Sequence, residues 1–175
     1  MEILVVYGIP LFLANLVHQV LIIPNNLFST FTIPIDAGWK IGSSSIFGSR
    51  KTIRGVLSVA FLSAVFTPFC ALFATGPGIY FVLTGFLVGA VYMLGELPNS
   101  FLKRRIGIPE SGRGSGLLGF FFLGVDHIDS VLVATVAIYF IEHPPVQQLL
   151  LFFCAGILAH SAVNIFLQHY GYKSF

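Results

Sequence analysis

The chain has 175 residues, of which 56% are hydrophobic and only 9% are charged, with a formal net charge of +2. Soluble domains carry about 25% charged residues, so this composition excludes an ordinary soluble enzyme and predicts an integral membrane protein. A nucleic-acid-binding protein is also disfavoured, because the Lys and Arg residues alternate with apolar stretches instead of forming a basic surface.

Five stretches of the sequence are apolar enough to cross a membrane, which takes about 20 mostly apolar residues for a helix. In chain order we expect helical spans at about 3–23, 56–74, 79–101, 128–141 and 147–168. The fourth of these is short. The sequence therefore predicts an all-α, polytopic membrane protein, a bundle of five transmembrane helices that forms a single domain over 1–175.

The cations predict how this bundle is oriented. Two connections, 24–55 and 102–125, hold eight of the nine Lys and Arg residues, whereas the turns at 75–78 and 142–145 hold none. Loops rich in Lys and Arg face the cytoplasm, so we expect the N-terminus outside, the C-terminus inside and the protein in the cell membrane. The nine cations are Lys40, Arg50, Lys51, Arg54, Lys103, Arg104, Arg105, Arg113 and Lys173.

The segment 46–55 brings Lys51, Thr52 and Arg54 together with two glycines immediately before the second expected span. Such a loop, together with the N-terminus of the helix that follows it, can wrap phosphate groups. It is not a P-loop, because that motif is absent and no strand is expected before it. By residue type alone, a positive anchor at the membrane surface explains these cations equally well.

The third expected span ends in polar residues that share one face. If the helix continues to residue 105, Glu96, Asn99, Ser100 and Lys103 stand at i, i+3, i+4 and i+7. Pro98 would remove a backbone hydrogen bond and bend the helix there. This pattern favours a ligand cavity, and the alternative is a water-exposed helix end whose cations contact lipid headgroups.

Two aspartates stand at the start of the fourth expected span. Asp126 and Asp129 are spaced i, i+3, so in a helix they face the same side. Paired carboxylates of this kind bind Mg²⁺ together with phosphate oxygens and water. The alternative is helix capping, since Asp is favoured in the first turn of a helix. His127 lies off the face that the aspartates share, so we do not expect it to act as a base.

Small and polar residues inside the spans have simpler explanations. Gly85 and Gly89 form a GxxxG pattern, which is typical of close helix packing. Interhelical hydrogen bonds, or a place in the lining of the same cavity, explain the polar side chains on helical faces. These side chains are Asn15, His18, Gln19, His160 and Asn164.

Taken together, four motifs in this order resemble the CDP-archaeol synthase family of membrane cytidylyltransferases, which is related to phosphatidate cytidylyltransferase. The motifs are Pro34-Ile-Asp36, Lys51-Thr-Ile-Arg-Gly55, Gly95-Glu-Leu-Pro-Asn-Ser-Phe-Leu-Lys-Arg-Arg-Ile-Gly107 and Asp126-His-Ile-Asp-Ser130. The resemblance implies a five-span bundle with a polar cavity open to the cytoplasm. It also implies a reaction in which CTP and a lipid phosphate, with Mg²⁺ as cofactor, give a CDP-activated lipid and pyrophosphate.

The resemblance also implies roles for individual residues. Lys103, Asp126 and Asp129 would be catalytic, and Glu96, Asp126 and Asp129 would bind the metal. Glu96 stands where the family pattern usually shows Asp, and His127 where Gln or Arg is expected. The residues expected to bind substrate are Lys51, Thr52, Arg54, Asn99, Ser100 and Arg104.

Two other functions are considered beside this one. A CDP-alcohol phosphotransferase also uses aspartates, but its motif continues with a glycine and an Ala-Arg pair, and here Asp129 is followed by Ser130-Val-Leu. A small transporter or scaffold could carry an ion path through Glu96, Asp126 and Asp129. An ion path should bring carboxylates toward the middle of the spans, and we expect all three near the cytoplasmic edge. The sequence leaves open whether the lipid is an archaeol-type ether phosphate or phosphatidic acid.

Overall fold

The structure is a computed structural model that describes residues 2–72, 74–110, 112 and 114–169. Arg113 and Lys173, which entered the predicted orientation, lie outside the described residues. Within those ranges, five helical segments are long and apolar enough to cross a membrane. The prediction of an all-α membrane protein with five spans is therefore confirmed.

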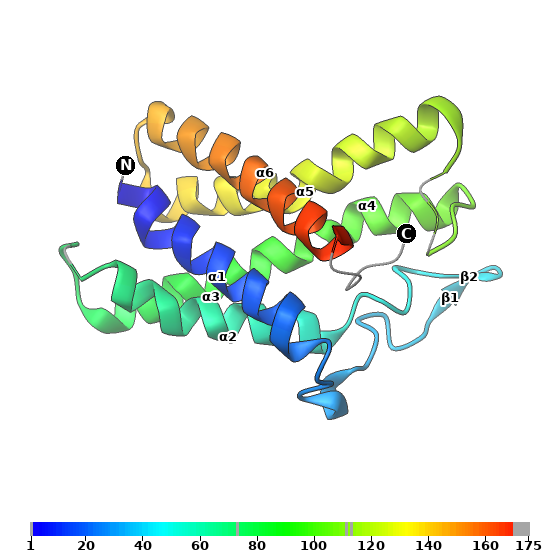
Figure 1. The fold of residues 1–175 in the computed structure, drawn as a ribbon, viewed down its shortest axis with the longest axis horizontal. Helices are drawn as coiled ribbons and strands as arrows, with labels where there is room; N and C mark the ends of the chain where they lie inside the picture. The colour runs from blue at the N-terminus through cyan, green and yellow to red at the C-terminus, as the bar shows by residue number, and fades with distance from the viewer. Residues whose placement is uncertain (1, 73, 111, 113, 170–175) are drawn as a thin grey trace.

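The helices run back and forth along the long axis of the molecule (Figure 1). The first span is η1 (Leu4–Gly8), α1 (Ile9–Val17) and η2 (His18–Ile22). The second is α2 (Ile53–Cys70), the third is α3 (Gly78–Leu94) with α4 (Glu96–Arg105), the fourth is α5 (Gly116–Glu142) and the fifth is α6 (Val146–His169). Between the first two spans lie η3 (Ser29–Phe31) and a hairpin of β1 (Lys40–Ile41) and β2 (Ser44–Ser45).

Helices α2 and α3 pack closely because glycines face the contact. A Cβ atom on Gly89 would lie 2.8 Å from Ser63 Oγ and 2.9 Å from the Cα of Ala60. A Cβ on Gly85 would lie 2.8 Å from the Ser63 carbonyl oxygen. No larger residue fits at these distances, so the interpretation of the GxxxG pattern as a packing motif is confirmed.

The third span continues to Arg105 as predicted, but Gly95 divides it into α3 and α4. Pro98 has no N–H with which to bond the carbonyl of Leu94, which explains the break one turn before it. At Gly95 the backbone also approaches α5, since a Cβ there would lie 3.0 Å from the Cα of Ser130. The bend therefore brings the polar end of the span against α5.

The fourth span differs from the prediction. It begins at Gly116, not at about residue 128, so the connection before it covers only 106–115. Asp126 and Asp129 predict the start of this span from the sequence, yet the segment that precedes them is apolar and helical. Ser115 is the N-cap and the first turn holds no acidic residue. Capping is thus excluded as the explanation for the aspartates, which lie in the middle of α5.

The loop between the first two spans is held in a defined shape by Asp36. One carboxylate oxygen accepts a hydrogen bond from the backbone N–H of Gly38 at 3.0 Å, and the other accepts from the N–H of Phe47 at 2.9 Å. Burial alone would raise the pKa of Asp36, but these backbone donors hold it below its usual value. The loop then returns to Thr52, whose Oγ1 accepts a hydrogen bond from Gly55 N at 3.3 Å and caps α2.

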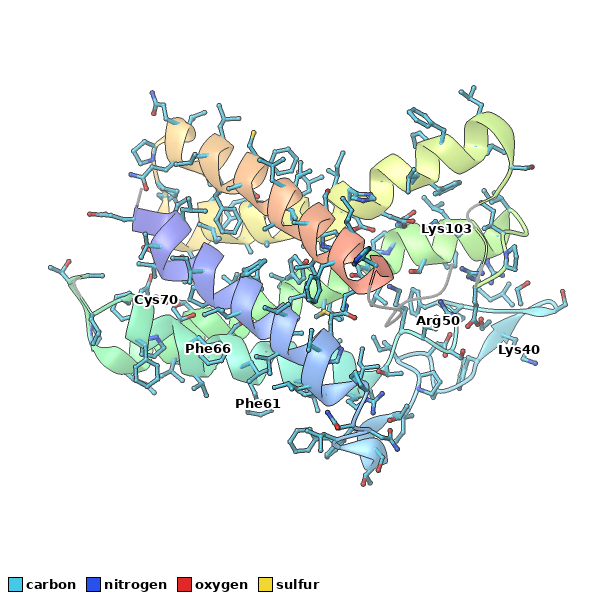
Figure 2. The ribbon with its side chains drawn as sticks, viewed as in Figure 1. Lys40, Arg50, Phe61, Phe66, Cys70 and Lys103 are labelled. Carbon is cyan, nitrogen blue, oxygen red and sulfur yellow. The ribbon has the colours of Figure 1, made fainter. Side chains whose placement is uncertain are left out.

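The hairpin is tied to the third and fourth spans. Arg105 donates to the carbonyl oxygens of Ile41 at 2.9 Å and Ser45 at 2.7 Å. Glu110 accepts from the backbone N of Ser49 at 2.9 Å and from its hydroxyl at 2.7 Å. These contacts cover one end of the bundle, the end that carries Lys40, Arg50 and Lys103, with Cys70 toward the other (Figure 2).

Candidate active site

Helix α4 buries three polar side chains. Asn99, Ser100 and Lys103 are 5%, 8% and 8% exposed, and the side chain of Glu96, one turn earlier, is 24% exposed. Asn99 and Lys103 both contact α5. The helical spacing thus predicted the face correctly, and the bend at Gly95 turns it toward α5.

Asn99 joins the two aspartates of α5. Its Nδ2 lies 2.6 Å from Asp126 Oδ1 and 2.9 Å from Asp129 Oδ2, so one amide group donates to both carboxylates. The other oxygen of Asp129 accepts from the backbone N of Ser130 at 2.6 Å. Asp126 and Asp129 therefore point to the same side of α5, as their spacing predicted.

Two lysines neutralise part of this negative charge. Lys103 Nζ lies 2.5 Å and 2.6 Å from the two oxygens of Asp126, and Lys51 forms an ion pair with Glu96. Burial alone would lower the pKa of Lys51, but the Glu96 carboxylate, with Asp129 and Asp126 beyond it, holds that pKa above its usual value. Lys51 is therefore held as a cation. Together with Lys103 it lies within a group of three carboxylates, Glu96, Asp126 and Asp129, which we call the carboxylate cluster.

The Lys51 contact also fixes the height of the cluster in the bundle. Lys51 lies just before α2, so the cluster is level with the N-terminal end of that span. Helix α2 has 18 residues and α5 has 27, and α5 extends past that level beside α4 (Figure 1). The cluster is consequently in the middle of α5 and level with the beginning of α2, so the expectation that Asp126 and Asp129 start their span is wrong. That the three carboxylates lie near the cytoplasmic edge stays a prediction.

The donor set of the cluster fits a hard divalent cation. Among the described residues, no group of three or more His, Cys, Asp and Glu side chains is arranged to hold a metal ion. However, Asn99 Oδ1 is buried and has no hydrogen-bond partner, beside Asp126 and Asp129. Mg²⁺ takes one or two carboxylates, and completes its shell with water and substrate phosphates. Asp126, Asp129 and the Asn99 oxygen meet this requirement. Glu96, the third expected ligand, pairs with Lys51 in this structure, and its part in metal binding stays a prediction.

Other residues expected to bind substrate make contacts outside the cluster. Thr52 caps α2. Arg54 donates to Asn26 Oδ1 at 3.0 Å, in the loop after the first span. Arg104 donates to the carbonyl oxygen of Ile108, and Ser100 is buried on the face shared with Asn99. The structure thus brings together Lys51, Glu96, Asn99, Lys103, Asp126 and Asp129.

A cavity of about 550 Å³ with many polar lining residues lies between the β1–β2 hairpin and the connection from α4 to α5. Arg104 lines it from α4, and Asp36, Ser45, Ser49 and Glu110 line it from the loops. Arg104 directly follows Lys103 in the chain, so the cavity and the cluster share one turn of helix. The hydroxyl groups and the charges of both signs suit a polar ligand that carries hydrogen-bond donors and acceptors.

Sequence reasoning missed one aromatic residue beside the cluster. Tyr92 is 4% exposed, and its hydroxyl lies 2.7 Å from Nδ1 of His160 on α6. The ring of His160 is 6.0 Å from that of His127, which in turn bonds the carbonyl oxygen of Leu123 at 2.7 Å through Nδ1. Tyr92 stands four residues before Glu96, and this helical spacing could have indicated its position.

Comparison with known proteins identifies the family. The model of the CarS-like CDP-archaeol synthase family matches residues 5–175. The chain belongs to this family. A CDP-archaeol synthase from Thermococcus gammatolerans is 30% identical over 146 residues, which cover 81% of this chain and 80% of the relative. Another CDP-archaeol synthase, from Saccharolobus islandicus, is 28% identical over 133 residues, 75% of this chain and 74% of that relative.

No solved structure matches the chain. Membership in the CDP-archaeol synthase family, over nearly the whole sequence, makes the chain a CTP-dependent cytidylyltransferase. It decides against the transporter and the scaffold, which the composition and the carboxylates alone had left open.

Proposed function

We propose that this enzyme transfers the cytidylyl group of CTP to an archaeol-type ether lipid phosphate, with Mg²⁺ bound at the carboxylate cluster and the active site facing the cytoplasm. One observation carries the proposal. Asp126 and Asp129 are held side by side by Asn99, and Lys51 and Lys103 flank them. The CDP-archaeol synthases that the chain resembles support the choice of lipid.

The reaction needs little covalent machinery. An oxygen of the lipid phosphate attacks the α-phosphorus of CTP, and the bond from that phosphorus to the bridging oxygen of the β-phosphate breaks. The bonding electrons leave with pyrophosphate, so no oxidant or reductant is required. A lipid phosphate is already anionic at neutral pH, which removes the need for a general base. Catalysis of this kind relies on positioning and on compensation of negative charge.

The residues of the cluster can both position the substrates and compensate their negative charge. Asp126, Asp129 and the oxygen of Asn99 would hold Mg²⁺, which when bound neutralises charge on the triphosphate. Lys51 and Lys103 can exchange their present carboxylate partners for phosphate oxygens of the incoming substrates. Lys103 would then stabilise the departing pyrophosphate.

The polar cavity of about 550 Å³ would receive the nucleoside end of CTP. It is lined by hydroxyl groups and by Glu110, which can accept hydrogen bonds from ribose or from an exocyclic amine. Arg104 connects the cavity to the cluster, so it is placed to bind the phosphate chain between the two. Every part of this route opens at the end of the bundle where the cations gather, which supports a cytoplasmic active site.

The test is a direct assay. Purified protein in lipid is incubated with labelled CTP, MgCl₂ and either archaeol-type ether phosphate or phosphatidic acid, and the products are separated to detect a CDP-lipid and pyrophosphate. We expect product with the ether lipid, and none when Mg²⁺ is replaced by EDTA. Folded protein that forms no CDP-lipid from either substrate would refute the proposal.

A matched pair of variants on α5 ties the activity to the cluster. Asp129→Ala removes one proposed metal ligand and should abolish turnover while the protein still inserts in the membrane. Thr135→Val lies further along the same helix, where its hydroxyl bonds only the Val131 carbonyl oxygen at 2.7 Å, and should retain activity. Full activity in Asp129→Ala would remove the metal assignment.

A further inference from the structure

A second cavity, of about 320 Å³, opens between the first span, α5 and α6. Its walls are mostly apolar and include Phe12 from α1 with Phe152 and Val163 from α6. Helix α6 contacts both α1 and α5, and in Figure 1 it crosses α5 and runs alongside α1. Both are membrane spans, so the cavity is a lateral groove that faces the hydrocarbon of the bilayer and not the water.

The inner end of this groove is polar, which is unusual for a cavity in contact with lipid. Three of its lining residues there are Asn15, Tyr92 and His160. Asn15 is only 8% exposed, and its amide makes no hydrogen bond to any part of the chain that the structure describes. Since Asn15 lines the groove, its amide is available to a ligand there that carries a polar atom.

The groove is continuous with the carboxylate cluster. Tyr92 bonds His160 at 2.7 Å on the groove side and lies one helical turn before Glu96. The ring of His160 is 6.0 Å from the ring of His127, the neighbour of Asp126. A molecule in the groove would therefore have its inner end within a few side chains of the aspartates, and its outer part among apolar walls.

We propose that this groove binds one hydrocarbon chain of the lipid phosphate substrate, with the Asn15 amide donating to an oxygen of its glycerol backbone. The inference rests on the proposed function, because that function supplies a ligand with a phosphate at one end and long chains at the other. The groove is likewise polar at the end near the cluster, where Asn15 lies, and apolar farther away, where Phe12 and Phe152 lie. A membrane lipid bound only through its hydrocarbon chains would offer no oxygen to the Asn15 amide, whereas the proposed substrate does.

The experiment uses an ether lipid phosphate with a photoreactive diazirine in one chain, added to the full-length protein in vesicles. After irradiation, the labelled peptides are mapped by mass spectrometry. We expect adducts on groove residues, reduced by excess unmodified lipid phosphate but not by the same dialkylglycerol without its phosphate. This readout does not require turnover, so it separates a failure of the groove from a failure of the proposed reaction.

Neighbouring residues on α6 give a matched pair of variants. Ala159→Phe fills the groove, since Ala159 lines it, whereas Leu158 is 71% exposed and absent from the lining, so Leu158→Phe is the control. Ala159→Phe should lose the groove adducts and raise KM for the long-chain lipid phosphate by at least about tenfold. KM for CTP should stay the same, as should turnover of a lipid phosphate with very short chains.

Asn15→Leu tests the polar end with a side chain of similar size. It should raise KM for the lipid phosphate and leave KM for CTP unchanged, even if Ala159→Phe fails to fold. Adducts spread evenly over the outer surface, equal in both α6 variants, would overturn the inference while CDP-lipid formation could stand. Groove adducts in a protein that forms no CDP-lipid would support the groove and refute the reaction. If dialkylglycerol without a phosphate reduced the groove adducts as much as the lipid phosphate does, the groove would be a site for bulk membrane lipid and the inference would be wrong.

Discussion

Asn99 donates to Asp126 and to Asp129 from a single amide group, and its oxygen is buried without a partner. The two carboxylates repel each other, and each remains in place only while a donor compensates its charge. Asp126 has a second donor from α4, which is Lys103. Among the described residues, Asn99 is the one side chain of α4 with a hydrogen bond to Asp129. The geometry of Asp129 thus depends more on Asn99 than that of Asp126 does.

Replacement of this amide should therefore affect metal binding as well as rate. We expect Asn99→Ala to lower kcat/KM by about 10–100-fold and to raise the Mg²⁺ concentration needed for half-maximal activity, because oriented partners of metal ligands contribute on this scale. Asn25→Ala is the control, since Asn25 lies in the exposed turn after the first span and its amide donates to the carbonyl oxygen of Leu21. Steady-state assays over a Mg²⁺ titration measure both. An unchanged Mg²⁺ dependence would show that Asn99 has no part in the metal site.

For single residues, the sequence predicts which side chains share a helix face better than it predicts which side chains form ion pairs between elements. Helical spacing placed Asn99 and Lys103 on one side of α4, and Asp126 with Asp129 on one side of α5. It did not show that Lys51 pairs with Glu96 and Lys103 with Asp126, because each pair depends on how a loop or a bend brings separate helices together. Arg54 and Arg104 illustrate the same limit, since motif position alone suggested contacts with phosphate, while their present partners are loop groups.

At the scale of elements, the error in the fourth span has a clear cause. Charged residues usually end a membrane span, so Asp126 and Asp129 were read as its boundary. Here a neighbouring helix supplies Asn99 and Lys103 as partners inside the bundle, and α5 continues through them. For the other spans, the apolar stretches and helix breakers indicated the ends to within a few residues.

The contact between α2 and α3 gives a prediction about packing. Gly89→Ala should lower the thermal unfolding temperature, because the new methyl group would lie 2.9 Å from the Cα of Ala60, where backbone must move to admit it. Gly124→Ala on α5 is the matched control, since a Cβ there meets nothing within 4 Å. That substitution should raise stability by about 0.5–1 kcal/mol through the helical preference of alanine. Thermal scans in the same detergent compare them, and equal shifts would contradict close packing at Gly89.

At the scale of the whole molecule, an odd number of spans predicts that the first span begins and the last span ends on opposite sides of the membrane. The side of each remains a prediction from the cations, which gather at one end of the bundle in the structure (Figure 2). That end also carries the hairpin, the polar cavity and the carboxylate cluster. A cytoplasmic orientation gives the cluster direct access to CTP.

Cysteine labelling measures this orientation. In a background with Cys70 and Cys154 replaced by alanine, Ser43→Cys marks the hairpin turn and Thr75→Cys marks the turn after α2, both at exposed positions. A membrane-impermeant maleimide applied to intact cells should label only Thr75→Cys, and permeabilised cells should also label Ser43→Cys. The reverse pattern would place the active site outside the cell and would contradict the proposed access of CTP.

The pairing between α4 and α5 also bears on how the chain enters the bilayer during synthesis. A helix with two unpaired aspartates near its middle inserts poorly, at a cost of about 2.5–3.5 kcal/mol for each at the helix centre. Asn99 and Lys103 precede Asp126 and Asp129 in the chain, so they leave the ribosome first. The third span is then already present at the translocon when the aspartates arrive, and the fourth span can move into lipid only beside it. We therefore expect the third and fourth spans to enter the bilayer as one unit.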